Sequence, residues 1–262
     1  MRRRPALLIA AGIAAFLLFL VALMPARVLL RFVPPQVSLS GVSGTVWRGK
    51  ADSVTLHAVA GSTLVRGSKP IGSLRWSFRP WRLAALELSY RVELKPPGGQ
   101  LAMNVSLGRG GLLRLGDVKG SFPVAAVDQI VAPAGWRGTV ELDVARLDLS
   151  SQTGFPTAAD GTATVRHLTA AGPGGIDIGS YELTLGQGAV GTREAIAGRL
   201  RDLGDGPMRV RGTLKLNVDG SYLLSGDVTA MAGAGPAVLN TLVFLGPPDS
   251  LGRRQFGIEG TL

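Results

Sequence analysis

Hydrophobic and polar residues alternate along most of the chain with a period of two residues. The longest run extends from Leu86 to Lys95, where leucine, tyrosine and valine alternate with glutamate, serine and arginine. Successive side chains of a β-strand point to opposite faces, so this pattern is typical of a sheet with one apolar and one polar face. The same alternation recurs in five further runs: 74–78, 101–107, 140–144, 181–185 and 214–218. We therefore expect a mainly β fold with a dozen or more strands in a large, curved, mostly antiparallel sheet.

Glycine and proline separate the alternating runs. The chain holds 37 glycines and 16 prolines but only 6% aromatic residues, which favours many turns between short strands. Asp219-Gly220 lies between two apolar alternations, and this dipeptide in that setting predicts a hairpin. Other turn signals lie at 96–99, 109–111 and 172–175.

Two segments break the alternation in the same way. Pro123 precedes residues 124–131 and Pro236 precedes residues 237–246, and in both segments apolar residues recur at helical spacing. Proline in the first turn of a helix loses no hydrogen bond, so we expect two short helices. Their recurrence suggests two related halves that meet near residues 150–160. Glycine-rich β sequences imitate one another, so a single undivided body stays open as the alternative.

The first strongly apolar segment is Pro5 to Met24, twenty residues without a charge. At about 1.5 Å per residue it would cross the roughly 30 Å hydrocarbon core of a bilayer. Arg2 to Arg4 precede it and the first acid is Asp52, so the positive-inside rule keeps residues 1–4 in the cytoplasm. We expect a transmembrane helix over 5–24, a juxtamembrane segment over 25–36 and a β domain outside the cytoplasm over 37–262.

A cleaved signal peptide is the alternative interpretation of this N-terminus. The apolar run is longer than the usual signal-peptide core, and no small-residue cleavage site follows it. Both features favour an uncleaved anchor, and both interpretations place the β body outside the cytoplasm.

The net charge of +10 is unevenly distributed. The first three arginines contribute +3, residues 27–119 contribute +10 from 14 bases and four acids, and residues 121–262 contribute −3 from 11 bases and 14 acids. The basic part follows the anchor directly, where it would face anionic lipid headgroups. Nucleic acid is a poor alternative partner because the bases are scattered and the domain lies outside the cytoplasm.

No residue pattern predicts catalysis, a cofactor or a metal. Gly44 to Ala51 resembles a phosphate-binding loop, but Ala51 lacks the hydroxyl for Mg²⁺ and a strand-like run follows instead of a helix. The chain has no cysteine, and His57 and His167 have no third ligand at a suitable spacing. The acids Glu141, Asp143 and Asp148 alternate on a polar face, which we interpret as solvation. An enzyme is therefore not expected.

The four tryptophans are Trp47, Trp76, Trp81 and Trp136, and each lies beside an arginine. Packing in the core or at a sheet edge is the simpler interpretation. Trp81 is the expected exception, because arginines surround it and such a ring suits a membrane or partner surface.

The order of the specific residues resembles the type II secretion system protein N (GspN) family, which is distantly similar to AsmA-like proteins. The resemblance covers nearly the whole chain and follows the basic N-terminus and anchor through segments 24–27, 39–47, 74–76, 79–81, 138–143, 212–214, 219–222, 245–249 and 260–262. Its motif or interaction residues are Gly41, Gly44, Trp47, Trp76, Arg79, Pro80 and Trp81.

This resemblance implies a non-catalytic accessory protein of the type II secretion machinery in the inner membrane. Its β domain would lie in the periplasm, and its partners would be other inner-membrane or periplasmic subunits. The likeness to AsmA-like proteins implies an alternative, in which an apolar groove of the sheet binds or handles lipid. A secretion component would bury its apolar face, whereas a lipid carrier would leave it open.

Overall fold

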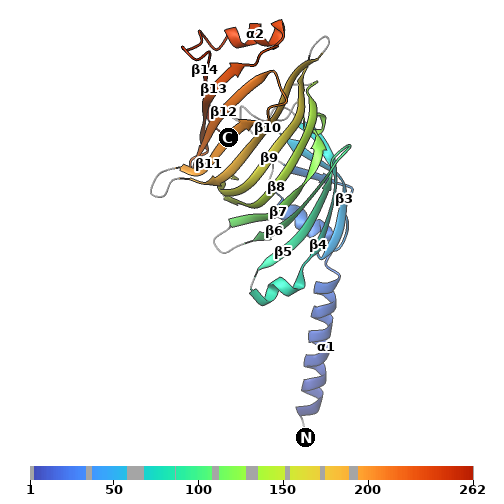
Figure 1. Cartoon of the computed structure of the whole chain (residues 1–262). Coiled ribbons are helices and arrows are strands. Elements are labelled where there is room, and N and C mark those ends of the chain that lie inside the picture. Colours follow the sequence, from blue (N-terminus) through green and yellow to red (C-terminus); the bar gives the residue numbers. More distant parts are fainter. Residues whose placement is uncertain are drawn as a thin grey trace.

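The computed structural model describes residues 3–33, 37–57, 68–85, 87–107, 112–127, 135–150, 154–171, 175–188 and 194–261. Helix α1 (Arg3–Ala22) projects from one end of a curled sheet (Figure 1). The 3₁₀ helix η1 (Ala26–Phe32) follows it and ends just before the tandem prolines of the sequence. That this segment lies at the membrane stays a prediction. No helix, within the described residues, combines the length and hydropathy that a membrane crossing demands.

Fourteen strands form one antiparallel sheet, which confirms the mainly β prediction. They are β1 (Val37–Ser40), β2 (Ser43–Gly44), β3 (Arg48–His57), β4 (Ser68–Phe78), β5 (Leu88–Lys95), β6 (Gln100–Leu107), β7 (Leu112–Pro123), β8 (Arg137–Ser150), β9 (Pro156–Ala170), β10 (Ile176–Gln187), β11 (Glu194–Asp202), β12 (Met208–Asn217), β13 (Ser221–Ala230) and β14 (Arg254–Thr261).

The strands follow one another in chain order across the sheet, except that β2 pairs with β3 beside β1. The predicted Asp219-Gly220 hairpin joins β12 to β13 with Gly220 at φ +83°. The turn signal at 109–111 and residues 172–174 of the one at 172–175 lie outside the described residues. The turn at 96–99 joins β5 to β6. The sheet continues from β8 to β9 across the proposed boundary, and whether the chain has two related halves stays a prediction.

The two faces of the sheet differ in polarity as the alternation predicts. On the apolar face Leu94 lies between Leu74 and Leu101 on the neighbouring strands. On the polar face Lys119 lies opposite Asp143 and forms an ion pair with it at 3.0 Å. Each face therefore continues from strand to strand, and the sheet has one apolar side over its length.

The structure corrects the prediction that Asp148 is a solvated acid on the polar face. Its side chain is only 3% exposed, and it accepts hydrogen bonds from Nε of Arg114 at 3.2 Å and Nε of Arg146 at 3.0 Å. The Arg146 hydrogen bonds lower the pKa of Asp148, and its partial burial opposes that effect. Asp143 stays 63% exposed, as a solvated acid should. Strict alternation would place Asp143 and Asp148, five residues apart, on opposite faces, and the register shift between Val144 and Arg146 brings both to the polar face. Alternation also does not distinguish a buried acid from a solvated one.

Helical segments cover the apolar face at its two ends. Near the N-terminal end, Ala26 and Leu29 of η1 pack with Ala51 and Trp76. Near the C-terminal end, Val238 and Leu242 of helix α2 (Pro236–Val243) pack with Val210 and Val228. Helix α2 lies where the sequence predicts it, with Pro236 in its first turn. The other predicted helix begins with a 3₁₀ turn, η3 (Val124–Ala126), and residues 128–131 of its segment lie outside the described residues.

Within the described residues, neither η1 nor α2 packs on the apolar face between these two covers, and the short η3 turn, whose Val124 and Ala126 are buried, lies beside β8. None of the three buried hydrophobic clusters joins a helix to the apolar side chains of β6–β9. We call this region the uncovered stretch. Most of its side chains are partly exposed, namely Leu101, Met103, Val105, Leu113, Leu115, Leu142 and Ala163, whereas Val118 and Val144 on the same face are buried.

Candidate functional site at the helix–sheet junction

The junction between α1 and the sheet gathers the glycine and tryptophan residues that the sequence singles out. The indole Nε1 of Trp47 donates a hydrogen bond of 2.8 Å to the carbonyl of Val21, in the last turn of α1. The backbone N–H of Val46 donates to the carbonyl of Met24 at 2.9 Å, and Pro25 forms an isolated bridge with Thr45. These contacts satisfy carbonyls that the end of a helix leaves free. The sheet is thus tied directly to the end of α1.

Trp76 forms the packed centre of the same junction. Only 7% of this residue is exposed, and its Nε1 donates to the carbonyls of Val46 at 3.2 Å and Thr45 at 3.3 Å. Its ring packs with Ala26 and Ala51. A buried indole needs a partner for its N–H, and here that partner is the loop that also holds Trp47. For Trp76 the core interpretation is therefore the one that fits the structure.

Two of the motif glycines occupy backbone positions that a side chain would disturb. Gly44 has φ +96°, and a Cβ there would lie 2.5 Å from the carbonyl oxygen of Arg48. Gly41 has φ +65°, and its Cβ would overlap the Asp52 side chain. Gly49 adds a third case, because the Trp76 ring lies 2.3 Å from where its Cβ would be. Sequence reasoning did not select Gly49, whose role depends on a neighbour 27 residues away.

The Arg79-Pro80-Trp81 motif lies at the end of β4 and in the 3₁₀ helix η2 (Pro80–Ala85) that follows it. Trp81 is 64% exposed, and the guanidinium of Arg79 lies 5.3 Å from its ring centroid in a cation–π contact. The backbone N–H of Arg79 donates to the carbonyl of Ser89 at 2.9 Å. Trp81 is therefore presented to solvent beside a cation, whereas Trp47 and Trp76 bind backbone carbonyls.

Aromatic contacts connect the junction to η2. Trp47 and Phe78 meet edge to face with centroids 4.8 Å apart, and Phe78 lies 5.4 Å from Tyr90. All seven motif residues thus lie in one part of the molecule, and we take this part as the candidate site. Nothing in its chemistry resembles a catalytic arrangement, since it offers indoles, backbone groups and arginines.

One group elsewhere resembles a hydrolase triad in its residue types. The Ser180 hydroxyl donates to the carboxylate of Asp205, and Nδ1 of His167 lies 4.0 Å from the same carboxylate. The arrangement does not fit a catalytic triad, because the Ser180 hydroxyl donates to the carboxylate of Asp205 instead of an imidazole and accepts a hydrogen bond from the backbone N–H of His167. The Ser180 hydrogen bonds also lower the pKa of Asp205. This group instead connects β9 and β10 to the loop after β11.

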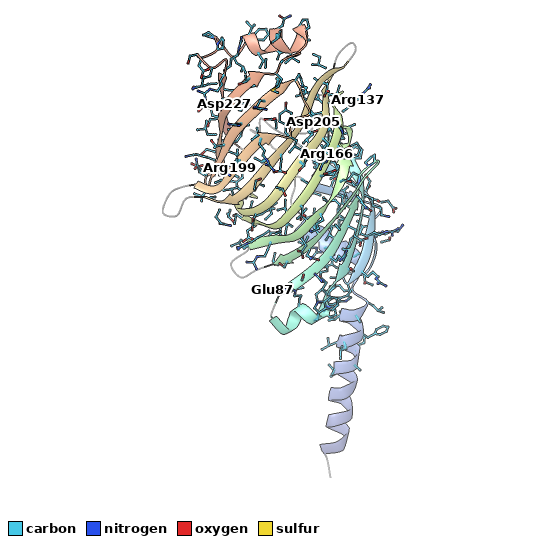
Figure 2. The ribbon with its side chains drawn as sticks, viewed as in Figure 1. Glu87, Arg137, Arg166, Arg199, Asp205 and Asp227 are labelled. Atoms are coloured by element: carbon cyan, nitrogen blue, oxygen red, sulfur yellow. The ribbon has the colours of Figure 1, made fainter. Side chains whose placement is uncertain are left out.

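A shallow hollow of about 480 Å³ lies on the polar face over β11–β13. Arg199, Arg211 and Asp227 contribute to its lining, and Figure 2 shows Arg199 and Asp227 on the C-terminal strands, far from the junction. Arg201 beside them pairs with Glu182, so positive and negative charges are mixed here. No group of three or more metal-binding side chains occurs among the described residues.

The comparison with known families identifies the chain. The sequence profile of Type II secretion system (T2SS), protein N, matches residues 35–257. The chain belongs to this family. The match begins just before β1 and ends within β14, so it contains the whole sheet up to that strand. No curated protein and no solved structure matches the chain. Membership confirms the resemblance drawn from the order of the motifs and assigns the protein to type II secretion.

Proposed function

We propose that this protein is a non-catalytic accessory component of the type II secretion machinery, anchored in the inner membrane with its β domain in the periplasm. The observation that carries the proposal is the family match over residues 35–257. The sequence adds an uncharged segment from Pro5 to Met24 behind Arg2 to Arg4, which favours insertion with the N-terminus in the cytoplasm.

The exposure of α1 is consistent with an anchor. From Ile13 to Val21 its large apolar side chains are all more than two-fifths exposed, with Leu18 at 71%. An α-helix that is apolar all round and whose described side chains from Ile13 to Val21 are exposed suits a lipid environment. The basic segment 27–119 would then lie nearest the bilayer and contact anionic headgroups.

In this proposal the junction is a positioning site. The hydrogen bond from Trp47 to α1 fixes the sheet relative to the anchor, and exposed Trp81 lies nearby for contact with a partner or headgroups. The partners are other inner-membrane or periplasmic secretion subunits.

Two measurements on the full chain test the proposal. A periplasm-active reporter fused after Leu262 should be active, and a silent but fully expressed fusion would overturn the orientation. The tagged protein, purified gently from native membranes, should carry other secretion subunits at levels well above those of abundant membrane proteins. Their absence from an intact, membrane-bound preparation would overturn the role in the machine.

A second candidate function rests on the uncovered stretch. Leu101, Val105 and Leu142 form part of an apolar surface on which neither η1 nor α2 packs, and acyl chains of a lipid would suit such a surface. The same purification tests it, with lipids scored beside proteins. Stoichiometric phospholipid or lipopolysaccharide that is lost in Val105→Asp, without secretion subunits, would favour lipid handling. Lipid at the level of a detergent annulus would exclude it.

A further inference from the structure

Five apolar side chains protrude from the end of the molecule that carries α2. Helix α2 buries only half of its apolar stripe: Val238 and Leu242 face the sheet, while Leu239 and Val243 are 45% and 62% exposed. Phe244 at the helix end is 91% exposed. We call the five exposed residues the distal tip: Leu239, Val243, Phe244, Leu245 and Leu251. Such clusters of large exposed apolar groups mark interaction sites on proteins.

The distal tip is held in shape by hydrogen bonds. The carboxylate of Asp249 accepts the backbone N–H of Leu251 at 2.8 Å and of Arg253 at 2.9 Å, and it also pairs with the Arg253 guanidinium. The backbone hydrogen bond from Arg253 is the largest of the effects that lower the pKa of Asp249. Arg254 donates to the carbonyl of Leu242 at 2.6 Å and so holds the end of α2. The apolar groups thus belong to an ordered loop.

The position of the distal tip restricts what could cover it. Figure 1 shows α1 and α2 at opposite ends of the molecule. The hydrogen bonds from Trp47 to Val21 and from Val46 to Met24 fasten the end of α1 to the sheet. A bilayer around α1 would therefore lie at the far end of the protein from Phe244. The lipid that holds the anchor is not the occupant of this surface.

The size and charge of the distal tip point to a protein partner within a larger assembly. Five side chains of this exposure offer on the order of 500 Å² of surface, whereas a stable pair buries about 800 Å² on each side. A second copy of this chain bound through the tip alone would be too weak. Residues 231–248 carry no charge, and Asp249 is paired with Arg253, so the tip suits an uncharged apolar pocket. Arg254 has no carboxylate within 4.0 Å among the described residues, which favours an acidic rim.

We propose that the distal tip inserts into a small apolar pocket with an acidic rim on another protein of the secretion machine. Phe244 is the central anchor, because an exposed aromatic side chain at the end of a helix fills such a pocket with little loss of conformational freedom. Leu239, Val243 and Leu251 surround it. This inference rests on the proposed function, since it takes the partner from the same machine.

The test places a photo-crosslinking amino acid at single positions of the full chain in cells that carry the secretion system. Phe244 and Leu251 are the test positions, and Val218 is the matched control, because it is 58% exposed and lies on the β12–β13 turn outside the tip. Crosslinks to one and the same secretion subunit are expected from both tip positions and not from Val218. In parallel, Phe244→Asp should lower recovery of that subunit with the purified protein at least tenfold, while Val218→Asp should leave it unchanged.

The outcomes separate the inference from the proposed function. If subunits copurify with the wild type and Phe244→Asp changes nothing, the inference fails and the proposed function stands. If no subunit copurifies with the wild type, the proposed function fails first. Crosslinks to a second copy of the chain, or to lipid only, overturn the inference. Because Phe244 makes little contact with the sheet, the thermal midpoint of Phe244→Asp should equal that of the wild type, and equality keeps the binding result interpretable.

Discussion

The two covered ends of the apolar face are fastened in different ways. At the N-terminal end, buried Trp76 and half-buried Trp47 donate hydrogen bonds to backbone carbonyls, and η1 packs beneath them. At the C-terminal end, Val238 and Leu242 attach α2 mainly by apolar packing, and the outer half of the helix stays exposed. The difference shows that one end is built to hold a fixed geometry with α1, whereas the other presents an apolar surface. The predictions below test this contrast.

Trp76→Ala should have the largest effect, because it removes a buried ring and both of its hydrogen bonds. We expect a loss of about 4 kcal/mol in the free energy of unfolding, typical of a buried aromatic residue replaced by alanine. Denaturant unfolding of the full chain in detergent, followed by circular dichroism, measures it. Trp81→Ala is the control, and at 64% exposure it should cost less than about 1 kcal/mol. Equal losses in the two variants would remove the distinction between a core and a surface tryptophan.

Leu242→Ala tests the C-terminal end. Leu242 is 5% exposed beneath α2, so its truncation should cost about 3 kcal/mol and loosen the helix. Hydrogen exchange should show faster exchange in residues 236–246 and no change at the junction. Leu239→Ala on the exposed half of the same helix should cost less than about 1 kcal/mol. Faster exchange at both ends would mean that the two covers are not independent.

Asp148→Ala tests whether the stability of the uncovered stretch depends on the ion pairs of its polar face, since neither η1 nor α2 packs on its apolar face. The change leaves Arg114 and Arg146 without their shared acid, and we expect a loss of about 2 kcal/mol. Asp143→Ala, at an exposed pair, should stay within about 0.5 kcal/mol.

The pH dependence of the Asp148 effect provides a second check. The pKa of Asp148 is lowered in the folded protein, so its contribution is present above the ordinary value of 3.8 and is lost as the pH falls through the folded-state pKa. The wild type and Asp148→Ala should therefore approach equal stability in acid. A difference that persists there would assign the effect to packing.

The smallest expected effect on stability comes from Tyr181, which packs against the hydrophobic cluster beneath α2. Burial raises the pKa of this phenol from 10.0 to about 12, and its hydroxyl donates to the carbonyl of Ile178. The unfolded chain ionises first, so stability should fall as the pH rises from 10 toward 12. Tyr181→Phe should make the stability curve flatter in this range. Spectrophotometric titration should also find Tyr181 ionising late in the folded protein, beside Tyr90, whose pKa burial also raises, and both should ionise at the ordinary pH after unfolding.

The local sequence pattern predicted the strands, turns and helix starts where neighbouring residues determine the structure. Alternation gave the strands, Asp219-Gly220 gave its hairpin and Pro236 gave the start of α2. After Pro123 the described residues show a 3₁₀ turn over Val124 to Ala126, and the rest of the predicted helical segment lies outside the described residues. Short apolar runs are ambiguous, since spacing alone does not say which surface will receive them.

The candidate site was predicted in its residues but not in its arrangement. Gly44, Trp47 and Trp76 are recognisable as motif residues, yet their meeting with the end of α1 depends on pairing between β3 and β4. The Ser180–Asp205 contact joins residues 25 apart through a loop and has no sequence signal. The distal tip was visible only as an apolar helix, because the sequence does not say which half of α2 the sheet covers.

The sequence by itself determined the two-faced sheet, the order of turns, the apolar N-terminal segment and the family. These follow from properties of single residues and their near neighbours, which act before any long-range contact forms. Only the tertiary structure decided that one continuous sheet forms, that η1 and α2 pack at the two ends of its apolar face, and that Asp148 is buried while Phe244 is exposed. Whether a side chain is buried depends on which surfaces pack together, and strand pairing and sheet curvature determine that packing.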